Sequence, residues 1–407
     1  MPPEGVADRR QFSVRWTGTL VPPRSGTFQF GLAAIGLARA YLDDELIVDN
    51  WTNTKPGELF FSRGTVEVVE RVELDADRRY DLRIEYATER DARPPAIRFG
   101  MTAPDVVDPV QLAANAARTA DAAVVIVGTN GDWETEGSDR PTMGLPGRQH
   151  ELIREVVKAN PRTIVVLNTG SPVEMGGAAS TVDDAPAILQ AWFGGQELGN
   201  ALADVLFGDV DPGGRLPTTF PHRYEDHPAL FNYPGEDGKV RYGEGVFIGY
   251  RGYGARRQEP RFPFGHGLSY ATFAYERGLE VTALEGTAPG VRGPLVAEVG
   301  VTVSNTGARR GHHVVQLYVR RSGEESVQRP DIELKGFEKV TLDPGASAAV
   351  TFVLDARSFA YYDTSEPGWV AEPGTYEVLV GSSSADVREA TMLTLPERIV
   401  LPNPTNL

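Results

Sequence analysis

The chain has 407 residues, more than the roughly 100–200 residues of an ordinary domain, so we expect two or three domains. Its 56 acidic and 40 basic residues give a formal charge of -16. A surface this negative repels phosphate backbones and anionic lipid headgroups, which argues against nucleic acid and membranes as partners. The absence of cysteine excludes disulfides, cysteine-ligated metals and thiol nucleophiles.

No export or membrane signal is evident in the sequence as given. Met1-Pro2-Pro3-Glu4 lacks the basic and apolar regions of a signal peptide. Apolar stretches such as Ala122–Val127 are far shorter than the roughly 20 residues that span a bilayer. A cytoplasmic location is therefore expected, unless an export signal belongs to an upstream part or partner.

Residues 1–104 are predicted to form an all-β sandwich. Phe12–Trp16 and Thr27–Phe30 alternate apolar with polar residues, as half-buried strands do. Asp43-Asp44-Glu45 separates two short apolar runs and predicts a hairpin, and Val66–Leu74 and Tyr80–Tyr86 add two more alternating runs.

Residues 105–273 are predicted to form a layered α/β domain with a mostly parallel sheet. Continuous apolar strands alternate here with helical patterns, and such strands are covered on both faces. Gly208 closes the last helix at the position where a left-handed residue is usual. The predicted strands are Ala122–Gly128, Thr163–Asn168 and Ala187–Trp192, and the predicted helices are Pro109–Arg118, Gly147–Ala159 and Leu198–Phe207.

The C-terminal part, residues 291–400, is predicted to be an immunoglobulin-like β-sandwich, joined by a polar linker at residues 274–290. Short alternating strands are separated there by turns such as Asp343-Pro344-Gly345. The predicted strands are Ala297–Asn305, Val314–Arg320, Ala348–Leu354 and Thr375–Gly381.

A dense polar loop, Asn130–Arg140, follows the strand Ala122–Gly128. Sites in parallel sheets form at the carboxyl ends of strands, so this loop is a candidate site. Its crowded carboxylates lie beside Trp133, a combination that can produce a general acid, and the indole could stack on a sugar. The same carboxylates could instead cap the next helix or be solvated, and spacing alone does not choose between these interpretations.

Other polar residues offer weaker candidates. The six histidines show no zinc spacing, and the adjacent His312 and His313 would point to opposite faces of a strand. Ser171 lacks the glycine pattern of a nucleophile elbow, and no glycine-rich loop suits a phosphate. We expect neither a metal nor a cofactor.

The polar loop resembles the acid/base loop of family 3 β-glucosidases in Trp133–Pro141 and Leu145-Pro146-Gly147. Residues 1–104 resemble the protective-antigen-type β domain found in a subset of these enzymes, and the C-terminal part resembles their fibronectin-III-like domain. Further stretches agree with the family in the same order: Gln190–Glu197, Ala203–Gly208, Pro212–Pro217, Pro263–Tyr270, Val303–Gly307 and Leu334–Val340.

The resemblance implies a retaining glycosidase acting on a β-glucoside or oligosaccharide. The second glutamate of the loop pattern is the family's general acid/base, which corresponds to Glu136, and Glu134 is the runner-up. Trp133 is a supporting residue. We expect Asp139 and Arg140 to form an ion pair that holds the loop, because arginine matches carboxylates well.

The family's nucleophilic aspartate lies on an N-terminal β/α barrel, which needs about 250 residues and has no counterpart here. The opening strands of the α/β domain are also expected to be missing. The chain is therefore expected to be inactive alone, either as a fragment of a longer product or as the partner of a separate barrel subunit.

The alternative is a non-catalytic carbohydrate-binding or scaffolding protein derived from such an enzyme. Retention of the whole acid/base loop argues against it, because a binding module does not need Glu136 in that setting. A truncated α/β domain also exposes an apolar edge, which makes a homo-oligomer possible.

Overall fold

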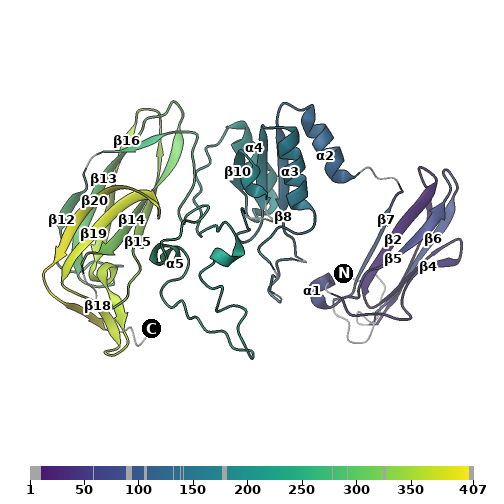
Figure 1. The fold of residues 1–407 in the computed structure, drawn as a ribbon, viewed down its shortest axis with the longest axis horizontal. Helices are drawn as coiled ribbons and strands as arrows, with labels where there is room; N and C mark the ends of the chain where they lie inside the picture. Colours follow the sequence, from purple (N-terminus) through teal and green to yellow (C-terminus); the bar gives the residue numbers. More distant parts are fainter. Residues whose placement is uncertain are drawn as a thin grey trace. The chain divides into compact units, whose positions relative to one another are not determined.

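The chain is multidomain, with an all-β sandwich, a layered α/β region and a second, immunoglobulin-like β-sandwich following one another (Figure 1). It divides into two compact units, Met1–Gly170 with Asp184–Leu189, and Ser171–Asp183 with Gln190–Leu407. The computed structural model describes residues 11–57, 59–88, 94–104, 108–131, 133–137, 139–140, 142–176, 181–276, 278–290, 292–323 and 327–402.

The N-terminal β domain consists of two antiparallel sheets with strand orders β1-β6-β3-β4 and β5-β2-β7. Its core is buried between them and includes Phe28, Phe30 and Leu32, the apolar positions of an alternating strand. The predicted hairpin is confirmed as β3 and β4, whereas β7 was not expected. The elements are β1 Ser13–Leu20, β2 Gly26–Ile35, β3 Leu37–Leu42, β4 Glu45–Asn50, α1 Leu59–Ser62, β5 Val68–Leu74, β6 Tyr80–Ala87 and β7 Ala96–Thr102.

The α/β region has a three-stranded sheet in the order β10-β9-β8, in which β8 and β9 run parallel. Helices α2 and α3 pack side by side (Figure 1). Asp108 caps α2 by accepting a hydrogen bond from the backbone N–H of Val110 at 3.0 Å. The elements are α2 Pro109–Arg118, β8 Ala123–Gly128, α3 Gln149–Ala159, β9 Thr163–Asn168, η1 Val182–Asp184, β10 Ala187–Gln190, η2 Gly195–Glu197 and α4 Leu198–Phe207.

Most of the predicted α/β elements are confirmed. The helices Pro109–Arg118 and Leu198–Phe207 and the strand Thr163–Asn168 have the expected bounds, and Gly208 adopts the left-handed conformation with φ 82°. The strand predicted to reach Trp192 ends at Gln190 instead. Trp192 has φ 55°, a conformation that cannot continue a strand.

Within the described part of the chain, the residues of strand β8 are buried on one face and exposed on the other. Ala123, Val125 and Val127 are buried, whereas Val124 and Ile126 on the opposite face are 47% and 61% exposed. The strand also lies at one edge of its three-stranded sheet. This differs from the predicted pattern of parallel strands that are buried on both faces.

The C-terminal β-sandwich is built around the sheets β15-β14-β19-β20 and β11-β13-β12, with β16 also paired to β13. Its buried core includes Val301, Leu317 and Val378. The four predicted strands are present, and β15 and β20 were not expected. The elements are β11 Phe273–Tyr275, β12 Glu280–Ala283, β13 Leu295–Asn305, β14 Gly311–Arg321, β15 Glu333–Leu342, β16 Ser347–Asp355, η4 Ala356–Phe359, β17 Tyr361–Asp363, β18 Gly368–Ala371, β19 Gly374–Ser383, β20 Asp386–Leu395 and β21 Ile399–Pro402.

The stretch 274–290, expected to be a linker, is a correction to the sequence interpretation. Both β11 and β12 pair with β13, so this stretch adds strands to the C-terminal sandwich. The polar composition that suggested a linker has a structural reason, because all four residues of β12 are exposed. A solvated edge strand needs no apolar alternation.

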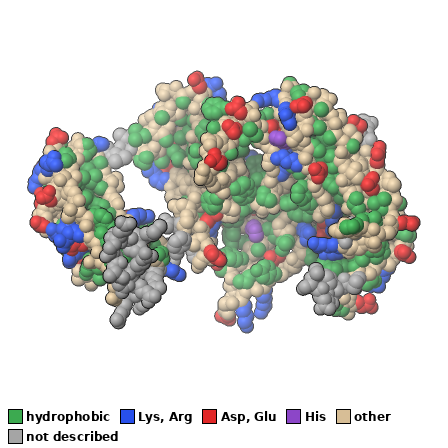
Figure 2. Space-filling view, turned by 180° about the vertical axis from the view of Figure 1, so that it is seen from behind, with side chains coloured by type: hydrophobic (Ala, Val, Ile, Leu, Met, Phe, Trp, Pro, Cys, Tyr) green, Lys and Arg blue, Asp and Glu red, His purple; other side chains and the backbone are tan. Residues whose placement is uncertain are grey.

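The surface charges and the lengths of the helices are relevant to the nucleic acid and membrane partners that the sequence argued against. Acidic and basic side chains are scattered over the face of the molecule seen in Figure 2. Within the described ranges, every helix is too short or too polar to cross a lipid bilayer.

Candidate functional site

The polar loop that the sequence singled out begins at the carboxyl end of β8, beside the end of β9. The backbone N–H of Thr129 donates to the carbonyl of Asn168 at 3.2 Å, which joins the two strand ends. A side chain at Gly128 would meet the Asn168 carbonyl oxygen at 2.0 Å, so only glycine allows this approach. The loop therefore lies where parallel sheets form their sites.

Glu134 is the anchor of the loop. One carboxylate oxygen accepts hydrogen bonds from the Thr129 hydroxyl at 2.9 Å and from the Arg140 guanidinium at 3.1 Å. The other accepts from the backbone N–H of Gly170, after β9, at 3.1 Å. The Glu134 and Arg140 side chains are each only 14% exposed, so this ion pair links both strand ends in a largely dehydrated setting.

This arrangement corrects the expected ion pair between Asp139 and Arg140. Arg140 bridges to Glu134, six residues earlier, and Asp139 is exposed, with no ion pair among the described residues. Adjacent side chains in an extended segment point in different directions, so one of the two turns inward and the other faces water.

Glu136 lies two residues beyond the anchor, and its side chain is exposed. Within the part of the chain that the structure describes, its carboxylate has no hydrogen bond or ion pair. Trp133 is half-buried, and its indole N–H is buried without a hydrogen-bond partner among those residues. A buried N–H group without a hydrogen-bond acceptor is unusual in a complete site. Such a group normally donates to water, a ligand or another chain.

The start of helix α3 is hydrogen-bonded to the end of β8 and to the residue that caps α2. The Gln149 side chain accepts from the Gly128 N–H at 2.6 Å and donates to the Gly128 carbonyl at 2.8 Å. The Arg148 guanidinium forms paired hydrogen bonds with Asp108 and Glu151 at 2.7 to 2.9 Å. These hydrogen bonds lower the pKa of the Asp108 and Glu151 carboxyls and raise the pKa of Arg148.

The structure brings Trp133, Glu134, Glu136, Asp139 and Arg140 into one loop, as the sequence predicted. Sequence reasoning missed Thr129 and Gly170, which hold Glu134. The available signal was a polar residue immediately after each of two neighbouring strands, at Thr129 and at Thr169-Gly170. Asp132, Ser138 and Pro141, which belong to the same predicted loop, lie outside the described residues.

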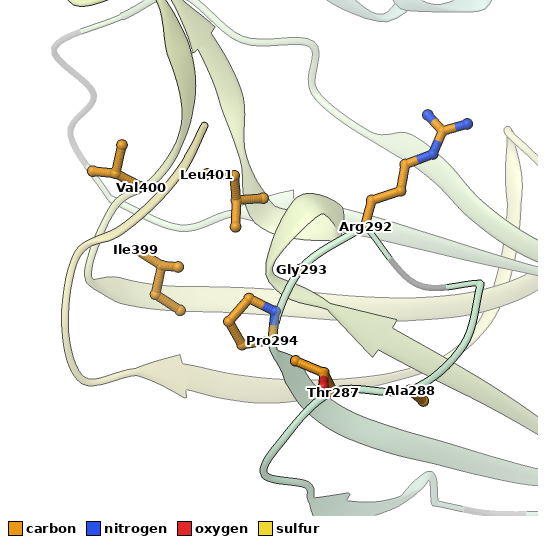
Figure 3. Close-up of a pocket in the computed structure, with 8 residues that line it drawn as sticks. All are labelled: Thr287, Ala288, Arg292, Gly293, Pro294, Ile399, Val400 and Leu401. Atoms are coloured by element: carbon orange, nitrogen blue, oxygen red, sulfur yellow. The ribbon is translucent and has the colours of Figure 1, made fainter. Parts of the chain in front are cut away.

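Two other features of the described chain are weaker candidates for a site. The hollow in Figure 3 has a volume of about 420 Å³ and lies in the C-terminal sandwich, lined by Pro294, Ile399 and Leu401 among others. The Arg292 guanidinium points away from these apolar side chains, which leaves little to orient a sugar hydroxyl. The structure also contains, in its described ranges, no group of three metal-binding side chains.

Three family profiles match the chain. The glycosyl hydrolase family 3 C-terminal domain matches residues 62–270, the fibronectin type III-like domain matches residues 313–384, and the PA14 domain matches residues 4–112. Together they agree with the resemblance seen in the sequence.

The curated relatives are β-glucosidases. The chain is 43% identical over 402 residues to one from Rhizobium radiobacter, covering 97% of this chain and 48% of the relative. It is 40% identical over 386 residues to one from Kluyveromyces marxianus, covering 92% of this chain and 44% of the relative. The chain thus spans about half the length of the curated relatives it matches.

Solved structures show the same relationship. The K. marxianus β-glucosidase in complex with glucose superimposes with a TM-score of 0.84 at 38% identity, covering 98% of this chain and 47% of that one. A family 3 β-glucosidase from Bifidobacterium adolescentis gives a TM-score of 0.64 at 42% identity, covering 70% of this chain and 40% of that one. From its matched domains and the loop at the end of β8, we conclude that this chain belongs to glycosyl hydrolase family 3 and corresponds to a C-terminal portion without the barrel.

Proposed function

We propose that this chain is the C-terminal part of a retaining β-glucosidase and supplies its general acid/base, Glu136. The observation that carries the proposal is the different environment of two glutamates in the same loop. Glu134 is tied to Arg140, Thr129 and Gly170, whereas Glu136 is exposed and unpaired among the described residues. A carboxyl group that exchanges protons with a substrate must be free of a permanent cationic partner.

In the proposed reaction, Glu136 donates a proton to the glycosidic oxygen while an aspartate on the absent barrel attacks the anomeric carbon. This produces a covalent glycosyl-enzyme, and Glu136 then takes a proton from the water that hydrolyses it. Retention requires the two carboxyl groups to lie about 5–5.5 Å apart. The anchor formed by Glu134 and Arg140 would hold Glu136 at a fixed distance from that second group.

The uncovered face of β8 supports the proposal that a further part of the enzyme completes this site. Val124 and Ile126 are exposed on a strand that lies at a sheet edge. Strands in mostly parallel sheets are normally covered on both faces.

The test joins the part of the R. radiobacter β-glucosidase that lies outside the match to the front of this chain, forming one chimera. The chain alone should release no nitrophenol from an aryl β-glucoside, and the chimera should. Glu136→Gln in the chimera should lower cellobiose hydrolysis by about 10²–10⁴-fold, the usual contribution of general acid/base catalysis. A dinitrophenyl glucoside, whose leaving group needs no proton, should still form the glycosyl-enzyme.

Azide provides the decisive readout, because it attacks the glycosyl-enzyme without needing a base. Azide should accelerate turnover of the activated substrate by the Glu136→Gln chimera and produce a β-glucosyl azide. Glu134→Gln is the matched control and should not be rescued. Rescue of Glu134→Gln alone would move the assignment to Glu134, and a folded chimera that binds glucose without any turnover would favour the carbohydrate-binding alternative.

A further inference from the structure

A second exposed feature lies in the stretch between η3, Tyr224–Asp226, and α5, Tyr250–Ala255. Figure 1 draws the chain leading into α5 as irregular coil, and we call its residues 231–248 the projecting loop. Phe231 is 95% exposed and Tyr242 is 80% exposed. Further exposed apolar side chains of the projecting loop are Tyr233, Val240, Val246 and Ile248.

The projecting loop is held in a defined shape by its own hydrogen bonds. Glu236 and Lys239 exchange two backbone hydrogen bonds at 3.0 and 2.9 Å, and the Asn232 side chain donates to Glu244. Gly235 has φ 93°, and a side chain there would meet the Lys239 carbonyl oxygen at 2.3 Å. Because the backbone of the loop is already positioned, less ordering cost remains when a partner binds.

The end of the projecting loop is fixed to a packed aromatic cluster. The Tyr250 ring stacks on Phe264 at 4.8 Å between centroids and meets the buried Tyr318 edge-on at 6.3 Å. The Tyr250 hydroxyl accepts a hydrogen bond from the backbone N–H of Leu334 at 3.0 Å. Arg251 forms an ion pair with Glu333 at 3.2 Å. The projecting loop is therefore held rigidly at its C-terminal end.

Exposed aromatic side chains on a rigid projection are typical of an interface that lacks its partner. Six exposed apolar side chains within this one loop mark an interaction site more strongly than a single exposed side chain does, and aromatic residues dominate the binding energy of interfaces. The residues around Phe231 and Tyr233 also enclose a hollow of about 440 Å³, which could receive a side chain of the partner.

The length of the relatives indicates what the partner is. This chain covers 48% of the R. radiobacter β-glucosidase and 44% of the K. marxianus one, so more than half of each lies outside the match. A second copy of this chain is a poorer partner, because two bodies that each carry a net charge of -16 repel one another.

From the exposure and rigidity of the projecting loop, we infer that it is a docking surface for the barrel half of the enzyme, with Phe231 and Tyr242 as its anchors. This inference rests on the proposed function in that it assumes a barrel half exists. It does not depend on the role of Glu136, so the two can fail separately.

The absence of cysteine from the chain provides a direct test. Phe231→Cys and Tyr242→Cys are prepared in the isolated chain and in the chimera with the R. radiobacter barrel half. The rate of maleimide labelling is then measured at each introduced thiol by mass spectrometry. Both thiols should react rapidly in the isolated chain and at least about tenfold more slowly in the chimera, because a covered site reacts only when it opens.

Phe337→Cys is the matched control, since Phe337 is 67% exposed on β15 of the C-terminal sandwich, and its labelling rate should be the same in both proteins. Equal labelling of Phe231→Cys and Tyr242→Cys in chimera and isolated chain overturns the inference. Slow labelling already in the isolated chain, together with a dimer in sedimentation velocity, also overturns it in favour of a second copy.

Glu136→Gln separates this inference from the proposed function. The Glu136→Gln chimera should protect the two thiols as well as the parent chimera does, while losing hydrolysis. Protection with undiminished hydrolysis would reject Glu136 as the acid/base and leave the docking surface standing. Normal loss of hydrolysis without protection would reject the docking surface alone.

Discussion

The C-terminal sandwich and strand β8 of the α/β region contain similar apolar sequences, but these are buried to different extents. In the sandwich, the core-facing residues of β13, β14 and β19 are buried, and the side chains of Leu317 and Val378 are completely covered. In β8, two of the five apolar residues face water at 47% and 61% exposure. The sandwich therefore buries the apolar core residues of its strands, whereas β8 leaves Val124 and Ile126 exposed among the described residues.

The largest effect that tests this comparison is expected in the core of the sandwich. Leu317→Ala removes a fully buried side chain and should lower the free energy of unfolding by about 2–5 kcal/mol. Val353→Ala on β16, where the side chain is 50% exposed, should change it by less than about 0.5 kcal/mol. Urea unfolding of both variants, followed by tryptophan fluorescence, measures the difference. Equal effects would mean that the sandwich is not an independently packed core.

A second effect concerns pH and a buried histidine in the same sandwich. The His313 ring stacks on Phe273 at 4.8 Å, and its Nε2 lies 2.7 Å from the Tyr275 hydroxyl. Burial lowers the pKa of His313 to about 4, with repulsion from Arg215 and Arg388 adding to the shift. The folded protein therefore keeps this ring neutral at pH values where the unfolded chain takes up a proton.

The direction of the pH effect on stability follows from this difference in proton binding between the folded and unfolded chain. The contribution of His313 to stability should be complete above its unfolded pKa of about 6.5 and should be lost progressively as the pH falls to about 4. The total loss should be on the order of 2–3 kcal/mol. Urea midpoints between pH 7.5 and 4 measure it, and His313→Phe should flatten that part of the profile. A profile unchanged by His313→Phe, compared with His312→Asn as control, would contradict the prediction.

The smallest effect is expected on the uncovered face of β8. Ile126→Thr should change the stability of the isolated chain by less than about 0.5 kcal/mol, because the side chain is already in water. Val125→Thr, on the buried face of the same strand, should cost about 1–3 kcal/mol by burying a hydroxyl group. Thermal unfolding of the two variants makes the comparison. In the chimera, Ile126→Thr should also lower the free energy of unfolding. If its effect there is as small as in the isolated chain, the added part of the chimera does not cover this face of β8.

Much of the fold followed from local patterns in the sequence. The helices Pro109–Arg118 and Leu198–Phe207 were predicted with their observed bounds, and the closing Gly208 of the second helix is a signal that lies within the local sequence. The strands β15 and β20 were missed. Four of the ten residues of β15 and five of the ten residues of β20 are exposed, and each strand is held in place by pairing, β15 with β14 and β20 with β19.

The candidate site divides in the same way. That the loop Trp133–Arg140 follows an apolar strand and contains two glutamates can be seen in the sequence, since both are local features. The pairing of Arg140 with Glu134 rather than Asp139, and the contribution of Gly170 to the anchor, emerge only in the folded chain. The tertiary structure also decided that one face of β8 is exposed. Each of these features depends on which groups approach one another in the folded chain, and residue order does not encode that directly.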